Sequence, residues 1–241
     1  MDEVARFSEV GDRYGEQLSR GLRLTGETAE YYARRRIARM RELAARHGTA
    51  ANTVLDFGCG TGASFALLRA AFPGARIIGF EPAAGLRAVA RDSAVSSRAE
   101  VLEADTLSLD GIADVVYCNG VFHHIVLPDR APAMQSVARA LRDGGLAFVW
   151  ENSPYNPGTR VVMSRIPFDR DARLLTPHAM RLLQRSCGVW TVVTEYHFVF
   201  PRALSLLRPV EPLVRALPLG GQYVVLGRRR GNDGTARVTG A

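Results

Sequence analysis

The segment VLDFGCGTGASFALL, residues 54–68, joins an apolar strand to a helix through a turn that has glycine at every second position. The strand is apolar until Asp56, and Gly58, Gly60 and Gly62 follow it. A parallel strand that leads through a glycine-rich turn into a helix brings backbone close to a ligand at the carboxyl end of the sheet. The segment therefore predicts an α/β fold that binds a nucleotide or nucleoside.

The spacing of the glycines indicates which ligand binds. A dinucleotide site has the pattern G-x-G-x-x-G, and a phosphate-binding P-loop has a lysine after its last glycine. Here the pattern is D-x-G-x-G-x-G, and the chain contains no lysine. An aspartate that faces the turn repels a phosphate and attracts a cation. The turn thus favours a nucleoside with positive charge and no phosphates, which fits S-adenosylmethionine with its ammonium group.

VLDFGCGTG resembles the first motif of the class I S-adenosylmethionine-dependent methyltransferases, and the resemblance covers about residues 50–151. It implies that Glu81, at the end of the second strand, accepts hydrogen bonds from both ribose hydroxyls. It also implies that Asp105 and Thr106 contact the adenine ring and that Asn119 lines the methionine portion. The cofactor-binding residues that the resemblance implies are Asp56, Phe57, Gly58, Gly60, Gly62, Glu81, Pro82, Asp105, Thr106 and Asn119.

Apolar strand-like runs alternate with helical runs along most of the chain. Apolar strands separated by helices predict βαβ units and a parallel sheet covered on both faces. We expect an α/β, doubly wound, mostly parallel seven-stranded sheet (a Rossmann-like methyltransferase fold) with N-terminal helices and insertions after strands 5 and 6. The strands are expected at 53–57, 76–80, 100–102, 113–118, 146–150 and within 189–200 and 222–229, and the helices at 27–47, 63–72, 84–92, 131–141 and 176–187.

The length predicts a single domain over residues 1–230, which the resemblance implies is a methyltransferase domain. Within it we expect an N-terminal helical cap (about 1–48), a cofactor-binding half (about 50–151) and an acceptor-side half (about 152–230). The small and polar residues 231–241 predict a disordered tail. Acceptor selection is expected in the segments without periodicity, and the predicted acceptor-binding residues are Tyr14, Tyr155, Asn156 and Arg160.

His123 and His124 are the only adjacent histidines, and the resemblance places them near the methyl group. An amine acceptor needs no strong catalyst, whereas a hydroxyl acceptor benefits from a general base. Either histidine is therefore a candidate catalytic base; the alternative is one packed and one solvated loop histidine. No metal site is predicted, because Asp169 and Asp171 are more simply interpreted as turn residues than as magnesium ligands.

The composition limits the partners and the location. The formal net charge of +7 is spread along the chain, so we expect no nucleic-acid partner. Neither a signal-peptide pattern nor a long uncharged apolar run occurs, which predicts a cytoplasmic protein without membrane contact. Three scattered cysteines predict a reduced compartment and no zinc site. The expected partner is a small-molecule acceptor, and the expected state is a monomer or a homodimer.

These features predict methyl transfer from S-adenosylmethionine to an oxygen or nitrogen of a small organic molecule. A second resemblance, of GETAEYYARRR and ENSPYNPGTR to bacterial small-molecule methyltransferases, implies specialised-metabolite biosynthesis of an antibiotic or a sugar. Three alternatives stay open. They are an RNA methyltransferase, an NAD(P)-dependent oxidoreductase on a related fold, and a non-catalytic scaffold that retains the cofactor pocket.

Overall fold

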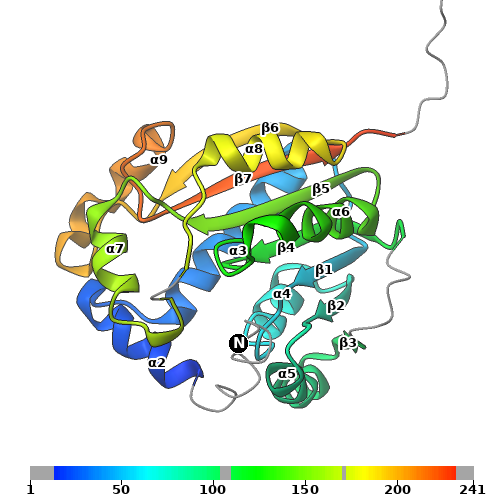
Figure 1. Cartoon of the computed structure of the whole chain (residues 1–241), viewed down its shortest axis with the longest axis horizontal. Helices are drawn as coiled ribbons and strands as arrows, with labels where there is room; N and C mark the ends of the chain where they lie inside the picture. The colour runs from blue at the N-terminus through cyan, green and yellow to red at the C-terminus, as the bar shows by residue number, and fades with distance from the viewer. Residues whose placement is uncertain (1–13, 104–109, 170–171, 232–241) are drawn as a thin grey trace, which may run out of the picture.

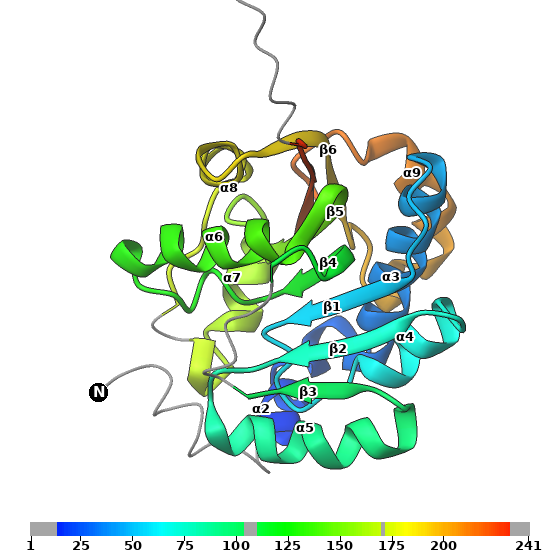
Figure 2. The same ribbon diagram turned by 90° about the vertical axis from the view of Figure 1, so that its right-hand side faces the viewer.

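A computed structural model of the chain describes residues 14–103, 110–169 and 172–231. Its centre is one seven-stranded sheet with helices on both faces (Figures 1 and 2). The strand order is β3-β2-β1-β4-β5-β7-β6, in which only β7 is antiparallel to its neighbours. The expected mostly parallel seven-stranded sheet is thus confirmed. The strands are β1 (Thr53–Phe57), β2 (Arg76–Phe80), β3 (Glu100–Leu102), β4 (Ala113–Asn119), β5 (Leu141–Asn152), β6 (Val189–His197) and β7 (Gln222–Arg229).

The helices cover the two faces of the sheet as separate layers. Buried residues of α3, α4 and α5 pack on one face, and those of α6 and α8 on the other. Alternate residues of β1 pack against the two layers. Val54 packs with the layer of α3, α4 and α5, and Leu55 packs with the layer of α6 and α8. The helices of the described chain are α2 (Tyr14–Leu22), α3 (Ala29–Arg46), α4 (Phe65–Ala71), α5 (Ala84–Ser97), α6 (Arg130–Ala140), α7 (Pro157–Met163), α8 (Pro177–Ser186) and α9 (Glu211–Val214), with the 3-10 helices η2 (Arg23–Thr25), η3 (Leu127–Asp129), η4 (Pro167–Asp169) and η5 (Arg202–Val210).

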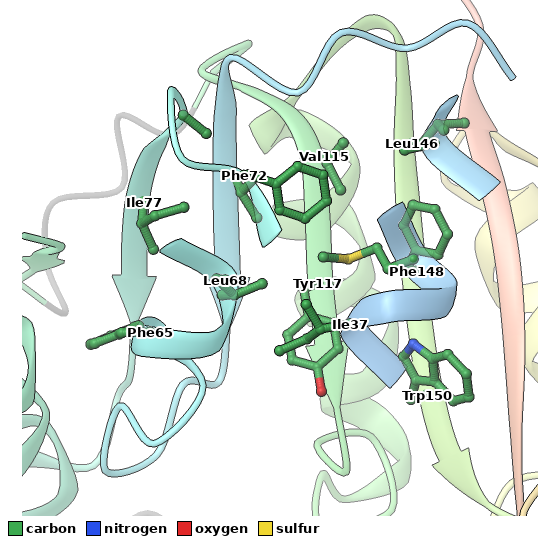
Figure 3. Close-up of a cluster of buried hydrophobic side chains, with 14 of the residues drawn as sticks. Ile37, Phe65, Leu68, Phe72, Ile77, Val115, Tyr117, Leu146, Phe148 and Trp150 are labelled. Atoms are coloured by element: carbon green, nitrogen blue, oxygen red, sulfur yellow. The ribbon is translucent and has the colours of Figure 1, made fainter. Parts of the chain in front are cut away.

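The core beneath α3 and α4 is built from large side chains (Figure 3). Phe65, Leu68, Phe148 and Trp150 are completely buried there. Burying one large apolar side chain stabilises a fold by about 1.5–3 kcal/mol. This layer therefore holds the strands rigidly in register, and their carboxyl ends form a fixed platform for a ligand.

The predicted elements are confirmed, with differences at a few ends. The helix expected at 84–92 continues to Ser97 and ends where Arg98 adopts a left-handed conformation with φ 50°. The strand expected at 146–150 extends over Leu141–Asn152. Thr176 caps α8 as predicted, because its side chain accepts a hydrogen bond from the N–H of Ala179.

The segments after β5 and β6 contain short helices rather than regular layers. Helix α7 starts at Pro157 because the Asn156 side chain caps it, and η4 follows. Between β6 and β7 the chain forms η5 and α9. The predicted tail, residues 231–241, lies outside the described residues except for Gly231. Within the described ranges, no helix combines the length and the apolar character needed to cross a membrane.

Candidate functional site

The glycine-rich turn between β1 and α4 packs against two neighbouring loops. Gly58 has φ +75°, and a Cβ atom there would lie 2.4 Å from Cγ2 of Val121, so only glycine fits. The N–H groups of Gly58 and Cys59 donate to the Phe80 carbonyl at 2.8 and 3.0 Å, which fixes the turn against the end of β2. Apart from its two chain neighbours, no described residue has an atom within 4 Å of the Cβ position of Gly60. A ligand can therefore approach the backbone of Gly60 closely.

Glu81 ties this turn to the end of β2. Its buried carboxylate accepts hydrogen bonds from the N–H of Gly60 and the N–H of Ala83, both at 2.9 Å. Burial raises the pKa of Glu81, and these two hydrogen bonds oppose the rise. A carboxylate has more acceptor positions than these two bonds use. The geometry leaves room for the predicted ribose contact, which stays a prediction.

Asp56, which the sequence predicted to face the turn, is buried at the end of β1. It is 2% exposed, and its carboxylate accepts a hydrogen bond from the Ser64 hydroxyl. Burial is the main cause that raises the pKa of Asp56 to about 7, although the Ser64 hydrogen bond lowers it. The sequence did not indicate this arrangement, because it depends on how the residue before α4 folds back over the strand end.

Asn119 and Arg36 both line a cavity near the carboxyl end of β4. Asn119 ends β4, and its Oδ1 atom is buried without a hydrogen-bond partner among the described residues. Arg36, from α3, donates to the Tyr117 hydroxyl at 3.0 Å and to Oε1 of Gln222 at 2.8 Å. The Arg36 side chain is buried, because α3 turns it onto the sheet.

His123 is held by a carboxylate that sequence reasoning missed. Its Nδ1 atom lies 2.5 Å from Oε2 of Glu151, which is completely buried at the end of β5. Glu151 also accepts hydrogen bonds from the N–H groups of Phe122 and Val121 at 2.8 and 3.2 Å. Burial lowers the pKa of His123, but the carboxylates of Glu151 and Asp169 outweigh it and raise that pKa to about 10.

Asp169 joins the two histidines from the other side. Its Oδ1 atom lies 3.1 Å from Nε2 of His124 and 3.6 Å from Nε2 of His123. Burial raises the pKa of Asp169, but both histidines outweigh it and bring the value to about 2. Burial and the neighbouring His123 lower the pKa of His124. The interpretation of Asp169 as a turn residue was wrong, because η4 buries it against the histidines; Asp171 lies outside the described residues.

A cavity of about 460 Å³ opens beside this group. Asn119, His123, His124 and Asp169 line one side of it, and Arg36 contributes a charge. The remaining wall is mostly apolar and comes from α2, α7, η4 and the residues that follow β6. Its apolar members include Leu18, Leu22, Val162, Met163, Ile166, Phe168, Phe198 and Phe200.

The predicted acceptor residues are only partly brought to this cavity. Asn156 lines it, but its side chain caps α7 and donates to the Leu219 carbonyl at 2.7 Å, so it supports the wall. Tyr155, which precedes the cap of α7, and Arg160, on the first turn of that helix, are exposed and do not line the cavity. Tyr14 begins α2, and its side chain is not among those described.

The other predicted cofactor residues surround the turn. Phe57 stacks on Phe80 with ring centroids 5.1 Å apart, and Pro82 is exposed beside Glu81. Gly62 has φ +72° at the start of the turn into α4. Asp105 and Thr106 lie outside the described residues.

The open backbone at Gly60, the acidic end of β2 and the unpartnered acceptor of Asn119 together fit a nucleoside that carries hydroxyl and ammonium donors. Within the described residues, no phosphate-binding loop accompanies them. The fold and the site therefore define an α/β protein of the nucleoside-binding class, with a mostly apolar cavity that Asn119 and the two histidines line.

Comparisons with known proteins identify the family. A model of the methyltransferase domain matches residues 55–149. The trans-aconitate 2-methyltransferase of Azoarcus sp. is 32% identical over 148 residues, which are 61% of this chain and 57% of that enzyme. The demethylmenaquinone methyltransferase of Thermus thermophilus is 30% identical over 205 residues, covering 83% of this chain and 86% of that enzyme.

A methyltransferase solved in complex with the Haloferax volcanii Trm112 methyltransferase activator has the same fold. Its TM-score is 0.62 at 19% identity, over 96% of this chain and 99% of that one. The chain belongs to the class I S-adenosylmethionine-dependent methyltransferases and is an enzyme of that class.

Proposed function

We propose that the protein transfers a methyl group from S-adenosylmethionine to an oxygen or nitrogen of a small, largely apolar organic molecule. The observation that carries the proposal is the cavity of about 460 Å³, which Asn119 lines at the end of β4 and whose wall is mostly apolar. Cavities that bind small ligands commonly measure roughly 300–1,000 Å³ and combine apolar walls with few polar groups. The cavity is therefore suited to hold one organic acceptor.

The residues around the glycine-rich turn would hold the cofactor. Glu81 is positioned to accept from its ribose hydroxyls, and Asn119 Oδ1 offers an acceptor to its ammonium group. The backbone from Gly58 to Gly62 would pass beneath it, and Asp105 and Thr106 are proposed for the adenine ring. When bound, S-adenosylmethionine supplies a methyl carbon that is activated by a sulfonium. The protein then has to position the acceptor and exclude water.

The histidine pair would serve an oxygen acceptor, whose proton has to leave. The two ring nitrogens of His123 both lie near carboxylates, Nδ1 by Glu151 and Nε2 by Asp169. This environment suits a protonated His123 that orients its neighbours. His124, which lines the cavity, is the better candidate for the general base. A neutral amine acceptor would need neither histidine as a base.

The cavity wall favours some acceptors over others. Among the described residues that line it, Arg36 is the one arginine, and that side chain already donates to Tyr117 and Gln222. A polyanionic acceptor such as trans-aconitate would find few charge partners there. An apolar phenol, hydroxylated ring or amine matches the wall better. This supports antibiotic-type specialised metabolism more than methylation of a free sugar.

Calorimetric titration of the full chain tests the cofactor proposal. We expect binding of S-adenosylmethionine and S-adenosylhomocysteine and none of NAD(P). Binding of NAD(P) instead would support the oxidoreductase alternative, and absence of all binding would support a scaffold.

An acceptor screen with radiolabelled methyl donor tests the transfer itself. Apolar phenols and amines should be methylated, whereas polycarboxylates and RNA should not; labelling of RNA alone would replace the proposal. With a hydroxyl acceptor, His124→Gln should lower kcat by about 100-fold or more, within the range of general base catalysis, while S-adenosylhomocysteine affinity stays unchanged. The exposed His178→Gln serves as the control.

A further inference from the structure

His123, His124 and Asp169 form a cluster that could do more than supply a general base for methyl transfer. Among the described residues, they are the group of three possible metal ligands whose donor atoms all lie within 4.8 Å of one another. We propose that this cluster binds a divalent first-row transition-metal ion, through Nε2 of both histidines and a carboxylate oxygen of Asp169. The metal-binding claim does not depend on the proposed function.

The distances between the donor atoms suit a shared ion. Two donors bound to one ion at about 2.0–2.2 Å lie about 3.0–3.6 Å apart in octahedral or tetrahedral geometry. Oδ1 of Asp169 lies 3.1 Å from Nε2 of His124 and 3.6 Å from Nε2 of His123. One donor atom from each of the three residues lies within 4.8 Å of the others, so an ion can enter when the side chains move closer together.

Glu151 supplies the outer support that a metal-binding histidine needs. A histidine that binds a metal through Nε2 keeps its proton on Nδ1 and donates it, most often to a carboxylate or a carbonyl. Nδ1 of His123 lies 2.5 Å from the completely buried Glu151, which is itself fixed by the backbone N–H groups of Val121 and Phe122. The ring of His123 is thus already oriented with Nε2 toward Asp169.

The buried charges around His123 and the position of the cluster on the cavity wall also favour a bound metal ion. Two carboxylates, Glu151 and Asp169, lie buried on opposite sides of His123, and a divalent cation would compensate them. All three proposed ligands line the cavity, so an ion held by them would keep a coordination position open to a small molecule. Two imidazoles and one carboxylate suit Zn²⁺, Co²⁺ or Fe²⁺ better than Mg²⁺, which prefers oxygen ligands.

An ion at this place would change how an oxygen acceptor is activated. A metal ion lowers the pKa of a hydroxyl that binds to it, and His124 would then act as a ligand rather than as the base. This consequence rests on the proposed function. Removal of the ion would slow methylation of a hydroxyl acceptor, while cofactor affinity would not change.

Titration of the purified, EDTA-treated full chain with Zn²⁺, Co²⁺ or Mg²⁺ tests the site without cofactor or acceptor. We expect one equivalent of Zn²⁺ or Co²⁺ per chain by calorimetry, visible absorption bands from bound Co²⁺, and no binding of Mg²⁺. Asp169→Asn and His124→Asn should each abolish the tight binding, and Glu151→Gln should weaken it about 10- to 100-fold. His178→Ala, which removes an exposed histidine elsewhere, should bind as the wild type does.

Circular dichroism identifies any variant that fails to fold, so that the conclusion rests on the folded ones. No saturable Zn²⁺ or Co²⁺ binding by the wild type, or equal affinity of wild type and a folded Asp169→Asn or His124→Asn variant, would overturn the proposal. In that case the cluster is a pair of histidine–carboxylate contacts only. Because the titration contains no S-adenosylmethionine, its failure leaves the proposed methyl transfer untouched.

Discussion

The carboxylate of Glu81 joins the glycine-rich turn to the residues that follow β2. Replacing Glu81 by glutamine removes one acceptor oxygen and the charge, while the shape is kept. A hydrogen bond to a charged group contributes about 1.5–3 kcal/mol. We therefore expect Glu81→Gln to weaken S-adenosylhomocysteine binding about 10- to 100-fold, measured by calorimetry. Glu100→Gln is the matched control, since Glu100 is exposed and pairs with Arg76 at the sheet edge. Equal affinities of the two variants would contradict the role of Glu81.

The individual site residues differ in how far the sequence could predict them. The positions of Gly58 in the turn and of Glu81 at the end of β2 were predictable, because the turn and the strand end are local in sequence. Asp169 lies 45 positions after His124, in a segment without periodicity, so nothing in the sequence joined them. Arg36 was missed because the face of α3 that meets the sheet is set by packing with strands far along the chain.

Helix α3 and strand β6 are tied by a mostly buried ion pair. Arg39 donates to Glu195 through Nε at 2.9 Å and Nη2 at 2.5 Å. Burial favours a higher pKa of Glu195, but hydrogen bonds from His197 and Arg39 outweigh it and lower the pKa to about 2. Loss of one partner from a buried pair costs about 3–5 kcal/mol. We expect Glu195→Gln to lose about 3 kcal/mol of unfolding free energy at pH 7, measured by urea denaturation.

The pH dependence of that loss follows from the lowered pKa. A carboxylate whose pKa is lower in the folded state stabilises the fold above its unfolded pKa of about 4.5, and this stabilisation is lost as pH falls toward 2. The difference between wild type and Glu195→Gln should therefore shrink between pH 5 and pH 2. Glu100→Gln, at an exposed pair, should cost at most about 1 kcal/mol at pH 7. A Glu195→Gln difference that is constant with pH would contradict the ion-pair explanation.

The strands and main helices could be predicted because each carries its own apolar pattern. The ends of elements were less accurate, as at β5, where pairing of Leu141 with Ala113 extends the strand beyond its apolar run. The segments after β5 and β6 have no pattern, and their short helices depend on caps such as Asn156 and on contacts with α2 and α3. These are the segments that build the acceptor cavity, so its shape was the least predictable part.

The molecule places the cofactor turn and the apolar cavity wall on different segments of the chain. The turn is fixed by β1, β2 and α4, whereas the wall comes from α2, α7 and residues after β6 (Figure 1). Strands of the sheet support the cofactor turn, whereas short helices joined by few regular contacts support the cavity wall. Changes in the wall should therefore alter acceptor use without altering cofactor binding.

Val161 on α7 provides a direct test of this separation. It lines the cavity yet is 48% exposed, so a larger side chain can occupy the cavity without overpacking the core. Misplacing an acceptor by about 1 Å can cost about 100-fold in rate. We expect Val161→Trp to lower kcat/KM for the acceptor at least about 10-fold and to leave S-adenosylhomocysteine affinity within about twofold of the wild type. Val192→Trp, at a 37% exposed position on β6 away from the cavity, is the control. Val161→Trp could instead weaken cofactor binding as much as it lowers acceptor turnover. The cavity and the cofactor site at the glycine-rich turn would then be one site, and the assigned acceptor position would be wrong.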